Sequence, residues 1–178
     1  MRYISTRGEA PVLGFCDALL AGLARDGGLY LPESWPQFTK PEIAAFAGKS
    51  YQDIAFSVLS RFTDGEIAPE KLQSMINEAY ATFRHDAVCP LVQTGANEFV
   101  AELFHGPTLA FKDVAMQLLA RLMDHVLAER GTRATIVGAT SGDTGGAAID
   151  AFAGRERTDM FILFPHGRVS PVQQRQMT

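Results

Sequence analysis

The chain has 178 residues, of which 47% are hydrophobic and 20% charged, so it can bury one core of ordinary size or two small ones. Its net charge of -4 provides no basic field, which excludes nucleic acid and anionic membranes as general partners. No apolar run reaches the roughly 18 residues of a membrane span, and the N-terminus lacks the apolar core of a signal peptide, so we expect a cytoplasmic protein. Cys16 and Cys89 lie far apart without a metal-ligand pattern, and no metal site is predicted.

Residues 1–89 are predicted to form a mainly helical subdomain. Short strands are expected at residues 1–7 and 29–31. Helices are expected at residues 15–25, 40–47, 50–62 and 69–83. Asp26-Gly27-Gly28 is expected to end the first helix, and Pro69 to open the last one. These elements bring no cluster of reactive side chains together in the sequence.

From residue 90 onward, short apolar runs alternate with helices. The runs lie at 91–92, 99–104, 134–137 and 160–164, and the helices are predicted at 109–130 and 144–153. This alternation predicts an α/β fold in which an incomplete parallel, or mixed, sheet is flanked by helices. Because a helix predicted within 169–178 meets no stop signal, we expect residues 90–178 to be the start of a truncated domain.

The segment His105-Gly-Pro-Thr-Leu-Ala-Phe-Lys112-Asp113 combines a stiff turn, a helix start and one amine. Thr108 is expected to cap the helix, which would place Lys112 in the first turn. The helix dipole disfavours a cation at that end, whereas a neutral amine is not penalised there. Phe111 adds an aromatic face and Asp113 a carboxylate. The segment indicates a nucleophilic lysine that forms a Schiff base with a carbonyl, and a solvated surface lysine is the alternative.

A second motif, Gly138-Ala-Thr-Ser-Gly-Asp-Thr-Gly145, follows a predicted strand and opens a helix. A turn of this kind presents free amides to an anion, while Thr140, Ser141 and Thr144 add hydroxyls and Asp143 adds an acceptor. An ordinary tight turn with a helix cap is the alternative. The motif lacks the lysine of a P-loop and the spacing of a G-x-G-x-x-G turn, which excludes these two nucleotide sites.

Both motifs resemble those of the threonine synthase family, fold type II enzymes that depend on pyridoxal 5'-phosphate (PLP). Further landmarks similar to those of the family follow in its order, at Ser5-Thr6-Arg7-Gly8, Asp26 to Pro32 and Val169 to Gln173. The resemblance covers almost the whole chain and implies a tryptophan synthase β-like fold. It also implies that residues 1–89 are the family's N-terminal subdomain and residues 90–178 the start of its PLP-binding domain.

The resemblance implies that Lys112 holds PLP, acts as the catalytic residue and moves protons. The residues implied to contact the cofactor are Lys112, Phe111, Asp113, Asp143 and Thr144. Those implied to bind substrate are Thr140, Ser141, Gly142, Asp143, Thr144 and His105. Many fold type II enzymes have asparagine where this chain has Asp143, and threonine synthases similar to it have aspartate. Independently of the resemblance, charge makes His166, Arg168 and Ser170 candidates for holding a substrate phosphate.

The implied reaction converts O-phospho-L-homoserine and water into L-threonine and phosphate. Two alternatives stay open, namely another fold type II lyase such as a serine or threonine dehydratase, and a folded domain without catalytic activity. We expect a fragment of this kind to be inactive alone and to self-associate, because an incomplete sheet leaves an edge and an apolar face uncovered.

Overall fold

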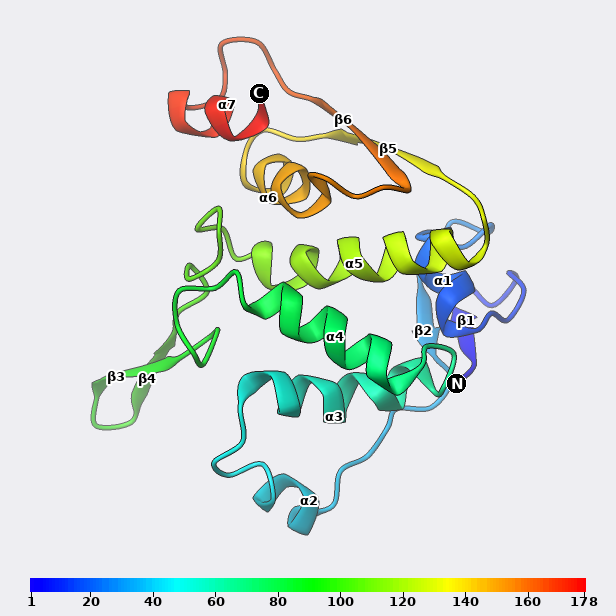
Figure 1. Cartoon of the computed structure of the whole chain (residues 1–178), viewed down its shortest axis with the longest axis vertical. Coiled ribbons are helices and arrows are strands. Elements are labelled where there is room, and N and C mark those ends of the chain that lie inside the picture. Colours follow the sequence, from blue (N-terminus) through cyan, green and yellow to red (C-terminus); the bar gives the residue numbers. More distant parts are fainter. The chain divides into compact units, whose positions relative to one another are not determined.

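The computed structural model describes all residues, 1–178. The chain forms two compact units, Met1–Ile76 and Asn77–Thr178. Their helices and strands are labelled in Figure 1. None of the helices is both long enough and apolar enough to cross a membrane.

The first unit begins with a two-stranded antiparallel sheet. β1 (Tyr3–Ser5) pairs with β2 (Tyr30–Pro32), close to the two strands expected at 1–7 and 29–31. Between them, α1 (Phe15–Ala21) is shorter than the helix expected at 15–25. The expected stop at Asp26 is wrong because Gly22 takes a left-handed conformation, with φ of 64°, and its N–H bonds to the Ala18 carbonyl.

Three further helices follow in the order expected. α2 (Lys40–Ala44) begins with a capping box in which Thr39 and Glu42 bond to each other's backbone N–H. α3 (Tyr51–Thr63) is capped by the Ser50 side chain, and Asp64, the residue that follows its last turn, is left-handed. α4 (Pro69–Tyr80) starts at its proline, as expected, and crosses from the first unit into the second.

The Asp26 carboxylate joins the N-terminal loops of the first unit. It accepts hydrogen bonds from the Ser5 hydroxyl at 2.7 Å and from the backbone N–H groups of Gly28, Glu9 and Ala10 at 2.9 to 3.0 Å. Desolvation raises the pKa of this carboxyl, but the four hydrogen bonds outweigh desolvation, and the pKa lies below its usual value. Two landmarks of the sequence, Ser5 to Gly8 and Asp26 to Gly28, are therefore held together by one side chain.

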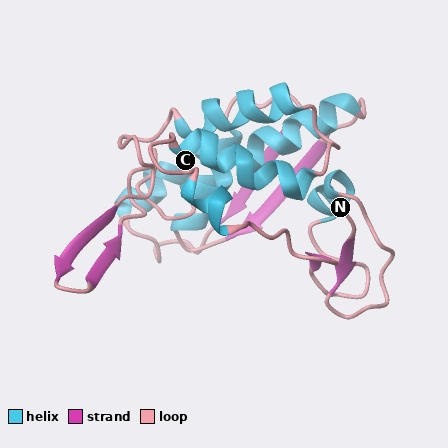
Figure 2. Ribbon diagram, turned by 90° about the horizontal axis from the view of Figure 1, so that it is seen from below, coloured by secondary structure: helices cyan, strands magenta, loops and turns pink.

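The second unit contains two separate pairs of strands. β3 (Leu91–Gly95) and β4 (Glu98–Ala101) form an antiparallel hairpin, seen as a two-stranded ribbon in Figure 2. The sequence predicts a parallel or mixed sheet without assigning this pair, and the two strands are antiparallel because only Ala96 and Asn97 connect them. A parallel pair needs a crossover of a dozen or more residues.

The other pair has the expected crossover. β5 (Ala134–Ala139) and β6 (Thr158–Leu163) are parallel, with Ile136 opposite Met160, and α6 (Asp143–Phe152) connects them. α6 contacts α5 (Asp113–Glu129), β6 and α7 (Pro171–Met177). One cluster of the unit's core consists of Ala120, Ala151 and Phe152, with Met116, Met123, Ile136 and Met160 packed around them. The opposite face of the strands is apolar and open, since Val137, Phe161 and Leu163 are 60 to 66% exposed.

A buried polar side chain of α5, Gln117, is paired with α6. Gln117 is 2% exposed and donates from Nε2 to Asp150 Oδ2 at 2.6 Å. Arg121 donates to the Gln117 carbonyl at 2.7 Å. Burial lowers the pKa of the Arg121 guanidinium, and the positive charge of Arg155 lowers it further. The two helices are thus joined by polar contacts as well as by the apolar core.

We expect Asp26→Asn to lower the melting temperature at pH 7, because an amide cannot accept all four hydrogen bonds. A carboxyl whose folded-state pKa is depressed stabilises the fold above its ordinary pKa of 3.8 and loses that contribution as pH falls through the lower folded value. The difference between wild type and variant should therefore shrink below pH 3.8 in thermal melts followed by circular dichroism. Asp86→Asn, at an exposed position, is the control; equal pH profiles for both variants would contradict this account.

Candidate functional site

The turn before α5 is built around the buried Asp113 carboxylate. Asp113 is 0% exposed and accepts hydrogen bonds from the Thr108 backbone N–H at 2.8 Å and from the Thr108 hydroxyl at 2.6 Å. Leu109 has a left-handed backbone conformation, with φ of 65°. Residues inside a right-handed α-helix have negative φ. The expected helix start at Leu109 with Thr108 as its cap is therefore wrong. The helix begins at Asp113, and Lys112 is the residue that precedes it.

Gly106 is required by the same carboxylate. A Cβ at this position would lie 2.4 Å from Asp113 Cβ and Oδ2, closer than any side chain can approach. The turn from Gly106 to Thr108 therefore closes directly onto Asp113. This packing determines where the next two residues of functional interest, Phe111 and Lys112, leave the turn.

Lys112 lies beside an aromatic ring at the positive end of α5. Its Nζ is 4.9 Å from the centroid of the Phe111 ring, which is itself 54% exposed. An aromatic ring stabilises a nearby cation, whereas the positive end of a helix destabilises it. The helix end does not destabilise a neutral amine. The position thus suits an amine that reacts as a nucleophile.

The second motif forms the turn between β5 and α6. The helix begins at Asp143, one residue before the expected position, so the motif supplies its first turn. The backbone N–H groups of Ser141, Asp143 and Thr144 have no acceptor within the chain, while the N–H of Gly142 bonds to the Thr140 hydroxyl at 3.3 Å. Free amides at a helix N-terminus bind anions, so the geometry has the property expected of this turn.

The two motifs meet in one open pocket of about 320 Å³. Its lining consists of Phe111, Lys112, Thr140, Ser141, Gly142, Asp143, Thr144 and Gln173. An amine, a set of hydroxyls and the free amides of a helix end therefore converge on the same space. This combination can attach a carbonyl compound and hold an anionic group beside it.

Two of the residues expected to contact ligand do not line this pocket. Asp113 faces Thr108, as described above, and holds the turn from behind. His105 pairs through Nε2 with Glu102 Oε2 at 2.7 Å, and its ring lies beside the tilted rings of His85 and Phe104. The structure places both residues next to the site but gives them partners of their own.

The loop between β6 and α7 carries the candidates for a substrate phosphate. His166 and Arg168 are exposed, and neither lines the pocket. Ser170 caps α7 by accepting a hydrogen bond from the Gln173 backbone N–H at 3.2 Å. Their assignment to a phosphate stays a prediction.

Sequence reasoning assigned no role to Gln173, although its side chain lines the pocket. Its Nε2 donates to Asp143 Oδ1 at 3.0 Å. The available signal was the serine and glutamine spaced by three residues at Ser170 and Gln173, which is typical of a capped first turn. That signal predicts the helix, but not which residue of another helix the glutamine contacts.

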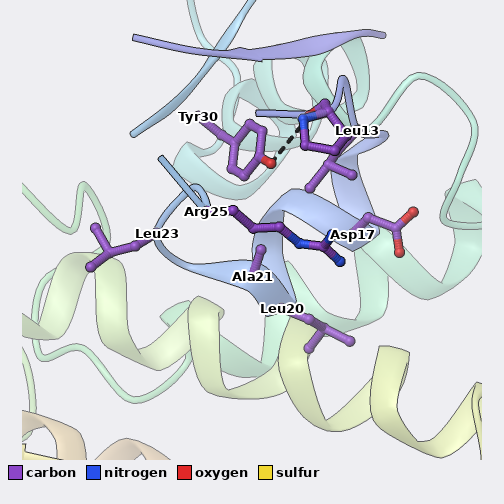
Figure 3. Close-up of a pocket in the computed structure, with 8 residues that line it drawn as sticks. Leu13, Asp17, Leu20, Ala21, Leu23, Arg25 and Tyr30 are labelled. Carbon is purple, nitrogen blue, oxygen red and sulfur yellow. Dashed lines mark hydrogen bonds between the residues drawn. The ribbon is translucent and has the colours of Figure 1, made fainter. Parts of the chain in front are cut away.

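A larger pocket of about 440 Å³ lies in the first unit, beside α1 (Figure 3). Apolar side chains such as Leu13, Leu20 and Leu23 make up most of its wall, and Tyr30 donates its hydroxyl to the Pro11 carbonyl at 3.1 Å. It offers neither an amine nor free helix amides. We therefore place the functional site in the smaller pocket, on chemistry and not on size.

Comparisons with known proteins point to one family. The model described as "Threonine synthase N terminus" matches residues 2–80. A curated threonine synthase of Pseudomonas aeruginosa is 60% identical over the whole chain, and one of Saccharomyces cerevisiae is 43% identical over 99% of it. The chain spans 38% and 37% of the lengths of these two relatives.

Solved structures agree with these matches. The PLP-bound threonine synthase from Brucella melitensis shares 76% identity with a TM-score of 0.98, and the yeast enzyme shares 42% with a TM-score of 0.93. The chain covers 38% of each of these two chains. They confirm the resemblance seen in the sequence and the expected fold class, an α/β fold of type II with helices around an incomplete sheet.

We expect Gly145→Ala to destabilise the protein by about 1–3 kcal/mol, because a Cβ there would lie 2.5 Å from Thr140 Cγ2 and 2.6 Å from Met177 Sδ. The neighbouring Gly146→Ala is the matched control, since its Cβ would meet only the Gln176 side chain at 3.3 Å. Urea denaturation should separate the two variants. Equal stabilities would mean that the start of α6 has room for a side chain and that its glycines are not required by packing.

Proposed function

Because the chain belongs to the threonine synthase family, we propose that it carries the cofactor lysine and the substrate loop of an enzyme that converts O-phospho-L-homoserine and water into L-threonine and phosphate. The supporting observation is the pocket in which Lys112 faces the first turn of α6. Since the chain spans 38% of the Pseudomonas relative, the complete reaction is proposed for a whole protein of that kind and not for these residues alone.

PLP fits the donors of this pocket. PLP carries an aldehyde that can form a Schiff base with an amine. Lys112 is the only lysine that lines the pocket. When bound, PLP supplies an electron sink that stabilises negative charge on the substrate carbons. We propose that Lys112 holds the cofactor covalently, that Phe111 lies against it, and that Asp143 and Thr144 contact it from the start of α6. Asp113 contributes by keeping the Lys112 turn closed through Thr108.

The start of α6 is proposed to bind the substrate carboxylate. The free N–H groups of Ser141 and Thr144 and the helix dipole favour an anion there. The hydroxyls of Thr140, Ser141 and Thr144 add donors, and Gly142 lets the ligand approach the backbone. A carboxylate accepts hydrogen bonds and repels another carboxylate, so we propose that Asp143 contacts a hydrogen-bond donor of the ligand and not the substrate carboxylate. His105, paired with Glu102, is proposed to contact substrate at the edge of the site.

Lys112 is also proposed to move protons. Once substrate takes its place on the cofactor, the amine is free and stays next to the pocket because Phe111 and the Asp113 turn restrict it. A neutral amine in that position accepts a proton from one substrate carbon and returns it to another. The same residue would thus serve in attachment and in acid–base chemistry.

We expect Lys112→Ala to abolish both the visible absorption of bound PLP and threonine formation, because no second lysine lines the pocket. Attachment is measured by absorbance, and by protein mass after borohydride reduction. Lys49→Ala, at an exposed position of the first unit, should behave as wild type. If Lys112→Ala still retains PLP after reduction and turns over normally, another residue holds the cofactor and this proposal is wrong.

We further expect the 178-residue chain by itself to bind PLP weakly and to release no phosphate from O-phosphohomoserine. The pocket is open, and its best anion site is the one assigned to substrate, so the cofactor phosphate would need another set of amides. The exposed Val137, Phe161 and Leu163 are expected to cause self-association, measured by light scattering. Tight, saturable PLP binding with turnover would overturn this expectation.

A further inference from the structure

One face of α7 contacts both motifs of the candidate site. Gln176 and Met177 lie three and four residues after Gln173, so both neighbour Gln173 on one side of the helix. Gln173 reaches the α6 turn, and Gln176 reaches the turn before Lys112. We propose that α7 positions the two motifs relative to each other and that Gln173 is a positioning residue that orients the Asp143 carboxylate for ligand binding. This inference rests on the proposed function of the pocket.

The hydrogen bonds of Gln173 determine the orientation of its amide. The Ser170 hydroxyl donates to Gln173 Oε1 at 3.2 Å, and Gln173 Nε2 donates to Asp143 Oδ1 at 3.0 Å. The opposite orientation would direct the Oε1 acceptor at a carboxylate that also only accepts. One oxygen of Asp143 is therefore occupied by α7, and Oδ2 is left for a ligand in the pocket.

The lack of a side chain at Gly142 permits this contact. A Cβ at Gly142 would lie 2.4 Å from Gln173 Nε2 and 2.7 Å from Gln173 Cδ. The glutamine amide thus packs directly on the backbone of the turn whose neighbouring amides are free. A change at Gln173 therefore acts on the carboxylate of Asp143 and on the position of the turn together.

The rest of the helix face ties α7 to the Lys112 side of the pocket. Gln176 Nε2 donates to the Thr108 carbonyl at 3.2 Å, and Thr108 in turn bonds to Asp113. Met177 is buried, and its sulfur packs against Gly145. Besides the direct packing of α5 on α6, the separation between the Lys112 turn and the α6 turn is therefore fixed by one short helix that contacts both turns.

An amide suits this position better than a charged side chain. It donates to Asp143 without neutralising it, so the carboxylate remains an acceptor at the positive end of α6. Glutamate would bring two carboxylates together, and lysine would remove the negative charge by pairing with it. The contact thus preserves the charge of Asp143 while restricting its rotation.

The first test compares Gln173→Ala with Gln174→Ala in the complete enzyme. Gln174 is exposed on the same helix and does not line the pocket, which makes it a matched control. Loss of a hydrogen bond to a charged group should raise KM for O-phosphohomoserine about 10-fold or more in Gln173→Ala, with a smaller change in kcat. PLP attachment to Lys112 should persist. Equal KM values for the two variants would overturn the proposal.

The second test needs no activity. In the protein without PLP, hydrogen–deuterium exchange over residues 138–147 should be about 10-fold faster in Gln173→Ala and faster still in Gln173→Glu, but unchanged in Gln174→Ala. In the double variant Gln173→Glu with Asp143→Asn, the amide at 143 would donate to the carboxylate at 173. This reversed hydrogen bond should restore slow hydrogen–deuterium exchange. Exchange that is equal in all variants, or no rescue in the double variant, would overturn the positioning role. Absence of PLP on Lys112 in the wild type would instead refute the proposed function.

Discussion

The buried Asp113 carboxylate is the interaction on which the geometry of the site depends. The carboxylate accepts hydrogen bonds from both the N–H and the hydroxyl of Thr108 and so closes the turn onto the helix. In this turn Leu109 is left-handed, so the helix does not extend back to it. A buried carboxylate without such donors would be strongly unfavourable, so the turn and the helix start stabilise each other. The consequence is that Lys112 leaves the backbone at the edge of the pocket instead of on the side of a helix.

The pocket is assembled from three segments that are distant in the chain. The Lys112 turn provides the amine and the α6 turn provides the hydroxyls and free amides, and α7 contacts both turns through glutamine side chains. Gly106 lets the Lys112 turn close onto Asp113, and Gly142 and Gly145 let the α6 turn approach Gln173 and Met177 of α7. Close packing at these three positions makes the site sensitive to changes far from its reactive atoms, because shifts in a packed interior are transmitted to neighbours.

The apolar surface of the second unit has a clear origin in the same architecture. Alternate residues of β5 and β6 face α5 and α6, where Ile136 and Met160 join the core. The outward half of each strand also carries apolar side chains, Val137 on β5 and Phe161 and Leu163 on β6. Strands that are apolar on both faces are typical of parallel sheets covered on both sides. All 178 residues of the chain align with the Pseudomonas threonine synthase, and they span 38% of that enzyme's length.

The order and type of most elements followed from the sequence alone. Apolar periodicity predicted α3, α5 and α6, and serine, proline and glycine marked several of their ends. The two motifs at Lys112 and at 138–145 were also recognisable, because an amine at a helix start and a glycine turn after a strand each have a local chemical meaning. What only the tertiary structure decided was the pairing of β3 with β4, the start of α5 at Asp113, and the contact of Gln173 with Asp143. Each of these features depends on which group forms hydrogen bonds with a carboxylate or with the backbone of a strand. The periodicity of one segment does not predict which residue of another segment will be that partner.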